Sequence, residues 1–228
     1  MKRLTLLFAL LAFSATAMAQ DVDFITELPD NFSELDTLPR PRQYKSIHMV
    51  GVQYSYNISG VRTNPEFETG YLFTAKNVAV LYTYYHALWD EMFNFGIQAG
   101  AKLGEEGYTA SKPGYGERCR IVEVPLISQF KIDFSSFRIL ANLGPYAGYR
   151  LSTDKQGGFD RFDQRFDYGA IGGVGLGIVF KPFELHIEGN YKFSLSSMYH
   201  TYKNSDLYWQ FVYPSNIMIS AGLFVHLW

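Results

Sequence analysis

The chain has 228 residues, of which 47% are hydrophobic, 17% are aromatic and 18% are charged, and its formal net charge is -2. The charged fraction lies below the roughly one quarter that is usual for soluble domains. Basic residues do not outnumber acidic ones, which argues against a nucleic-acid partner. The mean hydropathy of -0.08 is too polar for a membrane protein built from helices.

The N-terminus has the features of a secretory signal peptide. Lys2 and Arg3 precede the apolar run LTLLFALLAF, and an A-x-A cleavage site that ends at Ala19 follows it. The run is too short to cross a bilayer as a helix, which takes about 20 residues. We expect residues 1–19 to be removed on export. The single cysteine, Cys119, leaves the exported chain without an internal disulfide.

Residues 20–43 differ in composition from everything that follows. They hold six acidic residues against Arg40 and Arg42, and three prolines that interrupt any regular element. We interpret this segment as an extended, acidic periplasmic leader. It acts either as a solvated linker or as a short docking motif for a periplasmic partner.

Beyond residue 44 the hydrophobic pattern has a period of two residues, which indicates β-strands. In FELHIEGNYKFSLSS, residues 183–197, apolar residues such as Ile187 alternate with polar residues such as Glu188. A strand places these two sets on opposite faces, whereas a helix would mix them. The pattern predicts eight strands, at 45–59, 77–86, 92–103, 118–132, 137–151, 167–180, 183–197 and 214–228.

Long and short connections alternate between these strands. The long ones are 60–76, 104–117, 152–166 and 198–213, and the short ones are 87–91, 133–136 and 181–182. This alternation is typical of outer membrane barrels, which have short periplasmic turns and longer outside loops. We therefore predict that residues 44–228 form an all-β fold, an eight-stranded antiparallel up-and-down transmembrane β-barrel with both chain ends in the periplasm.

Two features favour lipid around this barrel. The polar faces carry charges and glycines that suit a crowded interior, and aromatic residues recur near both ends of the predicted strands. The barrel must close because open strand edges cannot hydrogen-bond to hydrocarbon. The alternative is an exported, soluble β-sandwich or lipocalin-like barrel. The membrane barrel and the soluble alternative differ in whether lipid surrounds the side chains of Phe95, Ile187 and Leu223.

Four segments resemble the PorT-like outer membrane β-barrel proteins. They are RIVEVPLISQFKI (120–132), LANLGPYAGYRLS (140–152), FDYGAIGGVGLGIVF (166–180) and IEGNYKFSLSSMY (187–199). The resemblance spans about residues 45–228. It implies an outer membrane barrel, and it raises a link to type IX-type protein secretion, in which the member that gives the family its name takes part. It implies no catalytic residues.

The facing assignment predicts a charge network inside the barrel. An eight-stranded barrel is only wide enough to be filled by side chains. Five positive and four negative residues at this density should pair, because an unpaired buried charge costs several kcal/mol. A salt-bridged plug is the favoured interpretation, and a gated ion path is the alternative. The predicted network, which also includes one histidine, comprises Lys102, Glu123, Lys131, Arg138, Arg150, Asp167, Glu184, His186, Glu188 and Lys192.

The sequence gives little support for catalysis or for a bound metal. Glu184, His186 and Glu188 could form an acid–base pair or a metal site, but strand alternation produces the same spacing wherever polar residues face inward. Cys119 has no base near it in sequence, and loop 152–166 lacks the oxygen array of a calcium loop. We predict a non-enzymatic protein without metal or cofactor.

The long loops are better candidates for function, because rigid barrels present their binding residues on loops. Aromatic residues are dense in loop 198–213, which suits a protein partner or a sugar face, although self-packing at the membrane interface is an alternative. The residues concerned are Tyr199, Tyr202, Tyr208, Trp209, Phe211 and Tyr213.

These observations predict an outer membrane anchor or accessory subunit of an envelope complex. Its expected partners are outer membrane lipid and lipopolysaccharide, together with proteins that contact the outer loops or the acidic leader. A porin-like pore for small solutes is the first alternative. A lipid-modifying or peptide-cleaving membrane enzyme is the second.

Overall fold

The computed structural model describes residues 46–66, 68–90, 93–110, 116–134, 137–201 and 210–227. No helix within these ranges is long and apolar enough to cross a membrane. The predicted signal peptide, the acidic leader and Trp228 lie outside the described residues.

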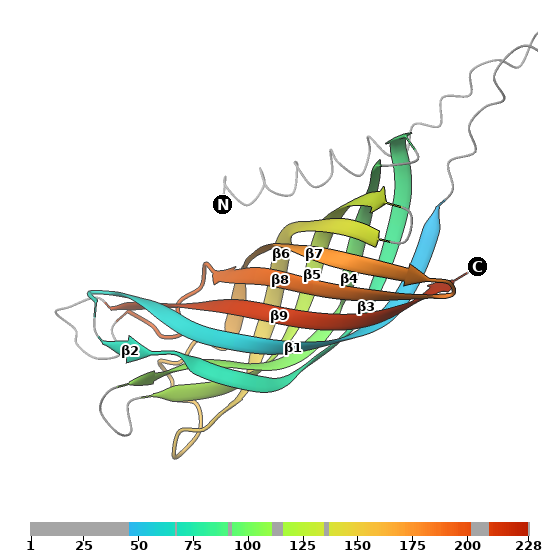
Figure 1. Cartoon of the computed structure of the whole chain (residues 1–228). Coiled ribbons are helices and arrows are strands. Elements are labelled where there is room, and N and C mark those ends of the chain that lie inside the picture. Colours follow the sequence, from blue (N-terminus) through green and yellow to red (C-terminus); the bar gives the residue numbers. More distant parts are fainter. Residues whose placement is uncertain are drawn as a thin grey trace, which may run out of the picture. The chain divides into compact units, whose positions relative to one another are not determined.

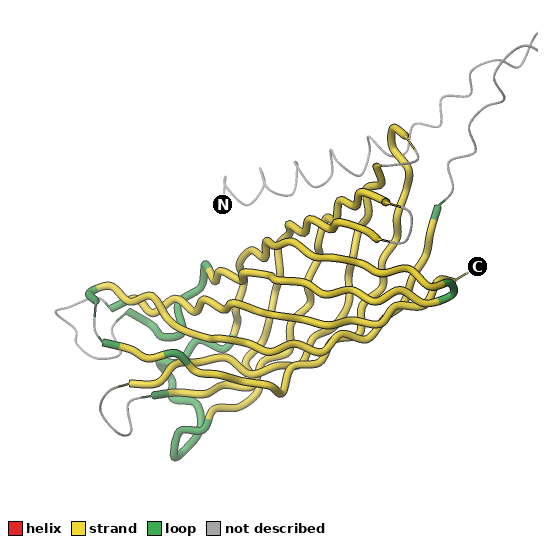
Figure 2. The backbone as a smooth tube through the Cα atoms, viewed as in Figure 1, coloured by secondary structure: helices red, strands yellow, loops and turns green. Residues whose placement is uncertain are grey.

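The described residues form one sheet of antiparallel strands (Figure 2). The strands are β1 (Ile47–Asn64), β2 (Thr69–Gly70), β3 (Leu72–Asp90), β4 (Phe93–Ala110), β5 (Glu117–Phe134), β6 (Phe137–Thr153), β7 (Phe166–Phe180), β8 (Phe183–Ser194) and β9 (Phe211–Leu227). The two-residue β2 directly precedes β3 and pairs with the end of β4. The other eight strands form the barrel.

Closure comes from pairing between β1 and β9, which completes the ring β1-β3-β4-β5-β6-β7-β8-β9 (Figure 1). The register pairs His48 with Leu227, so the start of β1 lies beside the end of β9. The ends of β3, β5 and β7 lie at this same end, here called the inner end. The longer connections lie at the opposite, outer end. The predicted fold class, an eight-stranded antiparallel up-and-down barrel, is confirmed.

Several strands extend further outward than predicted. β4 continues to Ala110, and its pairing with β5 persists as far as Tyr108 and Glu117. β1 likewise continues to Asn64, and β3 begins at Leu72. The predicted loops 60–76 and 104–117 are therefore wrong over much of their length. A strand needs only about 9–11 residues to cross a bilayer, and here the ladders continue beyond that minimum.

The outer surface of the barrel is a continuous apolar belt. Ile187 is 51% exposed and Leu223 is 44% exposed, while their chain neighbours Glu188 and Gly222 face inward. Aromatic side chains mark both edges of the belt. At the inner edge the exposed rings are Phe134, Phe137, Phe180 and Phe183, and at the outer edge they are Tyr56, Tyr149, Tyr168 and Tyr191.

An apolar surface this extensive is unfavourable in water, and aromatic edges are typical of the two interfaces of a bilayer. Closure satisfies the backbone groups that hydrocarbon could not. The barrel therefore has the surface of a membrane-spanning barrel and not of a soluble lipocalin-like one.

Candidate functional site: the packed lumen

All ten residues of the predicted network face the lumen, and none is more than 8% exposed. The placement follows from strand geometry, because side chains on one strand alternate between the two faces of the sheet. The ten are Lys102, Glu123, Lys131, Arg138, Arg150, Asp167, Glu184, His186, Glu188 and Lys192. The structure divides most of them between two ionic clusters at different depths.

The outer cluster consists of Lys192, Arg150, Glu106, Glu123 and Asp167. Lys192 Nζ lies 2.7 Å from a Glu106 oxygen and 3.5 Å from an Asp167 oxygen, and it also pairs with Glu123. Arg150 Nε lies 2.9 Å from Glu106, and its Nη2 lies 3.2 Å from Asp167. Five strands, β4 to β8, each contribute one member, so the cluster links more than half of the wall.

Asp167 also accepts hydrogen bonds from hydroxyl groups. The Tyr146 hydroxyl donates at 2.9 Å and the Ser196 hydroxyl at 2.6 Å, and Ser194 donates as well. The ammonium of Lys192 lies 4.7 Å from the centre of the Tyr146 ring. Charge-assisted hydrogen bonds of this kind are stronger than neutral ones, so the carboxylate is held in one orientation.

Buried apolar residues pack together in the lumen at its outer end. They are Tyr108, Cys119, Met198, Tyr199 and Val212, here called the outer cap.

Within this outer cap Tyr199 donates a hydrogen bond to Glu117, which Lys155 Nζ also contacts at 2.7 Å. Burial, followed by the charge of Glu117, raises the pKa of Tyr199, so its hydroxyl remains a donor at neutral pH. The outer cap therefore lies between the outer cluster and the outer mouth of the barrel.

The inner cluster contains Arg138, Glu184, His186, Asp133 and Lys131. Arg138 pairs with Glu184, and its Nε lies 2.9 Å from Asp133. His186 Nε2 lies 2.7 Å from Glu184, and Lys131 Nζ lies 3.6 Å from Asp133. Asp133 is 28% exposed, so this cluster reaches towards the inner end.

Apolar layers lie between and beside the two clusters. Ile127, Tyr146, Ile171 and Met218 pack together in the middle of the lumen. The described residues around this layer and Glu188 leave a void of about 20 Å³, close to the smallest space that holds one water molecule.

A second apolar layer, nearer the inner end, contains Met49, Leu81, Tyr85 and Phe224. Gly51 makes room for it, because a Cβ at that position would lie 2.3 Å from a Phe224 ring carbon.

Sequence reasoning missed four acidic residues of the interior and its mouths: Glu105, Glu106, Glu117 and Asp133. Glu106 is central to the outer cluster, yet it falls in the segment predicted as a loop. The polar face of β4 continues through Lys102, Gly104 and Glu106, and this continuation was the available signal. Three of these four are buried in addition to the four carboxylates expected inside, so the buried set has five basic residues and seven carboxylates.

A glycine shapes the strand where these acids lie. Gly107 has a φ of +152°, and a Cβ there would lie 1.9 Å from the Glu117 carbonyl oxygen. Only glycine permits so close an approach of β4 to β5. Residues 104–108 are consequently all buried, in place of the usual alternation.

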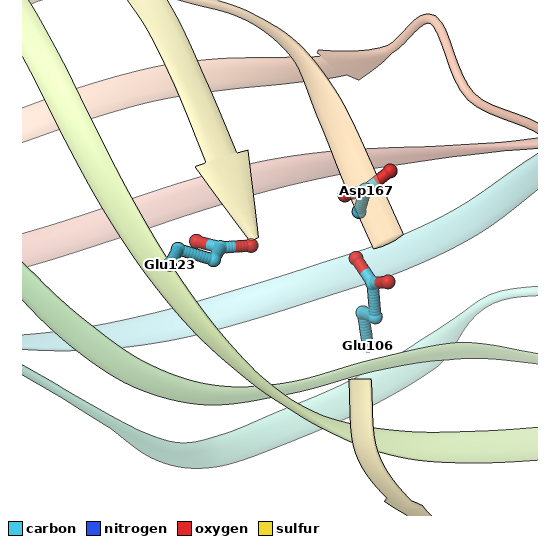
Figure 3. A group of neighbouring side chains, drawn as sticks. All are labelled: Glu106, Glu123 and Asp167. Atoms are coloured by element: carbon cyan, nitrogen blue, oxygen red, sulfur yellow. The ribbon is translucent and has the colours of Figure 1, made fainter. Parts of the chain in front are cut away.

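Glu106, Glu123 and Asp167 together have the geometry of a metal site. One oxygen from each lies within 4.8 Å of the others, and Figure 3 shows the three carboxylates turned towards a common space. Lys192 Nζ contacts all three of them, however. An ammonium group therefore supplies the positive charge that a cation would bring, and the arrangement is an ion-paired one.

The strand does bring Glu184, His186 and Glu188 together. His186 Nδ1 lies 3.6 Å from Glu188, and His226 Nε2 lies 3.0 Å from Glu184. Sequence reasoning did not connect His226 with this group. His186 is fully buried, and its ring centre lies 4.4 Å from that of Phe224. Cys119 is likewise buried, and its thiol donates to Glu117 at 3.4 Å.

The predicted aromatic loop is only partly within the described residues, since Tyr202, Tyr208 and Trp209 lie outside them. Tyr199 points into the outer cap, whereas Phe211 and Tyr213 belong to the start of β9. Their rings are stacked, with centroids 6.0 Å apart and planes 4° apart, and both side chains are partly exposed. The six residues therefore do not form one surface within the described part.

Comparisons with known proteins give structural neighbours only. No protein-family model matches the sequence, and no curated protein matches it. One similar structure is that of Ail, the attachment invasion locus protein of Yersinia pestis, in complex with the heparin analogue sucrose octasulfate. Its identity is 12% and its TM-score is 0.42, over 79% of this chain and 98% of that one. Another is the outer membrane protein AlkL in DMPC lipid bilayers, with 14% identity and a TM-score of 0.40, over 88% and 97%.

Proposed function

We propose that this chain is a non-conducting outer membrane barrel that serves as an anchor or accessory subunit of an envelope complex. The observation that carries the proposal is the filled lumen. The outer cap, two ionic clusters and two apolar layers occupy successive depths of its described length, and the void between the clusters measures only about 20 Å³. Such a barrel has no path for a solute, and its function then lies with its surfaces and loops.

Conductance measurements test the closed state. Reconstituted in planar bilayers, the wild-type protein should show no discrete steps, and neither should the Lys102→Ala and Glu188→Ala variants. Folding in each sample is verified by a heat-dependent shift in gel mobility. Steps whose size changes with either variant would instead support the small-solute pore.

The proposed anchoring role needs a partner. Pull-down from native membranes, with the full chain and with a chain lacking residues 20–43, should recover another envelope protein. Loss of that protein only from the shortened chain assigns the contact to the acidic leader, and retention assigns it to the outer loops. Recovery of the barrel alone in both cases contradicts the role.

The proposed link to type IX-type secretion is supported by the resemblance of residues 120–132, 140–152, 166–180 and 187–199 to PorT-like proteins. It is tested by comparing surface-exposed and released proteins between a deletion strain and the wild type. Depletion of exported surface proteins in the deletion strain is the expected result. Unchanged export would confine the role to anchoring.

The proposal includes no catalytic step. The proposed absence of catalysis is supported by the full burial of His186, because a substrate could not reach its imidazole. Lipid profiles of the deletion strain and the wild type should be the same. A lipid species that disappears in the deletion strain would point to a lipid-modifying enzyme instead.

A further inference from the structure

An open cleft of about 660 Å³ lies at the outer end of the barrel, where the chain continues from β8. Its volume is within the roughly 300–1,000 Å³ that small-molecule sites occupy. The Leu195 N–H donates to the Tyr168 carbonyl on β7 at 2.9 Å, and the Met198 N–H donates to the Val212 carbonyl on β9 at 2.7 Å. The chain that forms the floor of the cleft therefore stays paired to both neighbouring strands.

Two pairs of aromatic residues form the sides of the cleft. Phe166 and Tyr168, at the start of β7, have ring centres 6.0 Å apart. Phe211 and Tyr213, at the start of β9, are stacked with ring centres 6.0 Å apart and planes 4° apart. Because β8 lies between these strands, the two sides are two strand spacings apart, about 10 Å. A ligand in the cleft therefore meets aromatic side chains from both sides.

The two charged side chains in the described lining balance each other. They are Arg165 and Asp163, and each has partners outside the cleft. The Arg165 guanidinium donates to the Leu151 carbonyl on β6 at 3.3 Å and lies 4.7 Å from the centre of the Phe159 ring. Lys155 Nζ contacts Asp163 at 3.3 Å. The lining therefore favours a ligand without net charge.

Neutral polar groups complete the lining. Their backbone is already engaged, because the Met198 carbonyl accepts from the Gln164 N–H at 2.8 Å and the His200 N–H donates to the Phe162 carbonyl at 2.8 Å. A peptide that bound as an added strand would need unpaired backbone groups. Recognition therefore falls to side chains that donate and accept hydrogen bonds. These are Gln164, Ser196, Ser197, His200 and Thr201.

We propose that this cleft, here called the β8 cleft, binds the neutral sugars in the headgroup of a membrane glycolipid. A sugar ring has apolar C–H faces and a rim of hydroxyl groups, which match the aromatic sides and the neutral polar groups of the lining. Its membrane source follows from Tyr168 and Leu195, which line the cleft and are also exposed on the apolar belt. Sugars held in the β8 cleft lie directly above the hydrocarbon, and the acyl chains lie along the belt.

The inference rests on the proposed function, which assigns activity to the surfaces of the barrel, and it gives one of those surfaces a ligand. The test compares two lipids with the same acyl chains. They are digalactosyldiacylglycerol, whose headgroup is two neutral sugars, and phosphatidylcholine. The protein in nanodiscs that contain equal amounts of both is released into a native mass spectrometer, and the retained lipids are counted. The wild type should retain the glycolipid in preference, and equal retention of the two lipids overturns the proposal.

Substitutions on the two sides of the β8 cleft should reduce this preference. The double variant Phe211→Leu, Tyr213→Leu should lose it by about tenfold, because two aromatic faces are removed while the surface stays apolar. The single variant Phe166→Leu, on the opposite side, should lose about threefold and gives a second measurement if the double variant fails to insert. An unchanged preference in either inserted variant contradicts the β8 cleft.

A second aromatic pair at the outer edge of the belt provides the matched control. Tyr56 on β1 and Phe73 on β3 are exposed and stacked, with ring centres 6.4 Å apart, and neither lines the cleft. The variant Tyr56→Leu, Phe73→Leu should therefore keep the wild-type preference. A loss equal to that of the double variant in the cleft overturns the proposal, because aromatic residues anywhere on the edge would then suffice.

Soluble digalactose, the same headgroup without acyl chains, separates a membrane ligand from a free sugar. Added at the concentration of the glycolipid, it should leave the retained glycolipid unchanged, because it makes no contact with the belt. Displacement of the glycolipid overturns the membrane source, since the site would then recognise free sugar.

Insertion is measured separately, by the heat-dependent mobility shift in the same nanodiscs. A folded and inserted wild-type protein without glycolipid preference contradicts the β8 cleft alone. The proposed anchoring role fails independently of this result, when pull-down from native membranes recovers the barrel without a partner.

Discussion

The two ionic clusters of the lumen use similar residue types in different surroundings. In the outer cluster the side chains of Lys192, Glu106 and Asp167 are at most 1% exposed, and apolar residues lie on both sides of them. In the inner cluster the side chain of Asp133 is 28% exposed, and that of His226, which contacts Glu184, is 18% exposed. Similar ion pairs are therefore sealed at one end of the barrel and partly hydrated at the other.

This difference determines what each cluster contributes. Where water cannot enter, a charge that loses its partner keeps the full cost of its desolvation, so the members of the outer cluster depend on one another. Where water can enter, it partly replaces a lost partner. We infer that the outer cluster fixes the barrel as a unit, whereas the inner cluster tolerates change.

The largest effect should come from Lys192→Met. The substitution removes the ammonium group that three buried carboxylates share, and we expect it to lower the free energy of unfolding by about 3–5 kcal/mol. Urea unfolding in detergent micelles, followed by tryptophan fluorescence, measures this change.

The combination with Glu106→Gln tests whether the cluster acts as a unit. Because the second substitution removes one of the carboxylates that share the Lys192 ammonium group, the double variant should be less destabilised than the sum of the two single variants. Additive losses would show that the cluster members are independent.

A smaller effect is expected for Arg138→Gln in the inner cluster. The loss should be about 2 kcal/mol, because His186 and His226 still contact Glu184 when Arg138 is removed, and water reaches its other partner, Asp133. Salt sharpens the comparison, since ions screen hydrated charges far more than sealed ones. The loss should shrink in about 1 M salt, whereas that of Lys192→Met should not. Equal salt sensitivity would remove the distinction between the two ends.

The smallest effect is expected at the outer cap. Tyr199→Phe removes the hydroxyl that donates to Glu117 while Lys155 and Thr153 still contact that carboxylate, so the loss should be about 1 kcal/mol. Tyr213→Phe, at a partly exposed ring, is the control and should change nothing. If Tyr199→Phe is also silent in urea unfolding, the outer cap does not seal the outer cluster.

The facing of the strands was predictable from the sequence alone. Alternation is a local property, so Ile187 could be assigned to lipid and Glu188 to the lumen without knowledge of any other strand. Which charges meet depends on the register between strands. Lys192 contacts Glu106, which lies 86 residues earlier, and no pattern within either segment indicates that contact.

The outer cluster was also incomplete because the strand ends were misplaced. The hydrophobic period marks only the part of a strand that faces lipid, and beyond it the outward residues of β5 become Arg118 and Arg120. The ladder with β4 continues there without an apolar signal. Glu106 and Glu117 lie in this extension, and so sequence reasoning assigned them to a loop.

The seam between β1 and β9 has a consequence for biogenesis. All 17 residues of β9 pair with β1, although the two strands stand at opposite ends of the described chain. The ring cannot close until β9 has been synthesised, so closure of the barrel must follow translation of this strand. A product truncated before Phe211 would lack β9, so the edges of β1 and β8 would expose unpaired backbone groups to hydrocarbon. We expect the cell to degrade such a product before insertion.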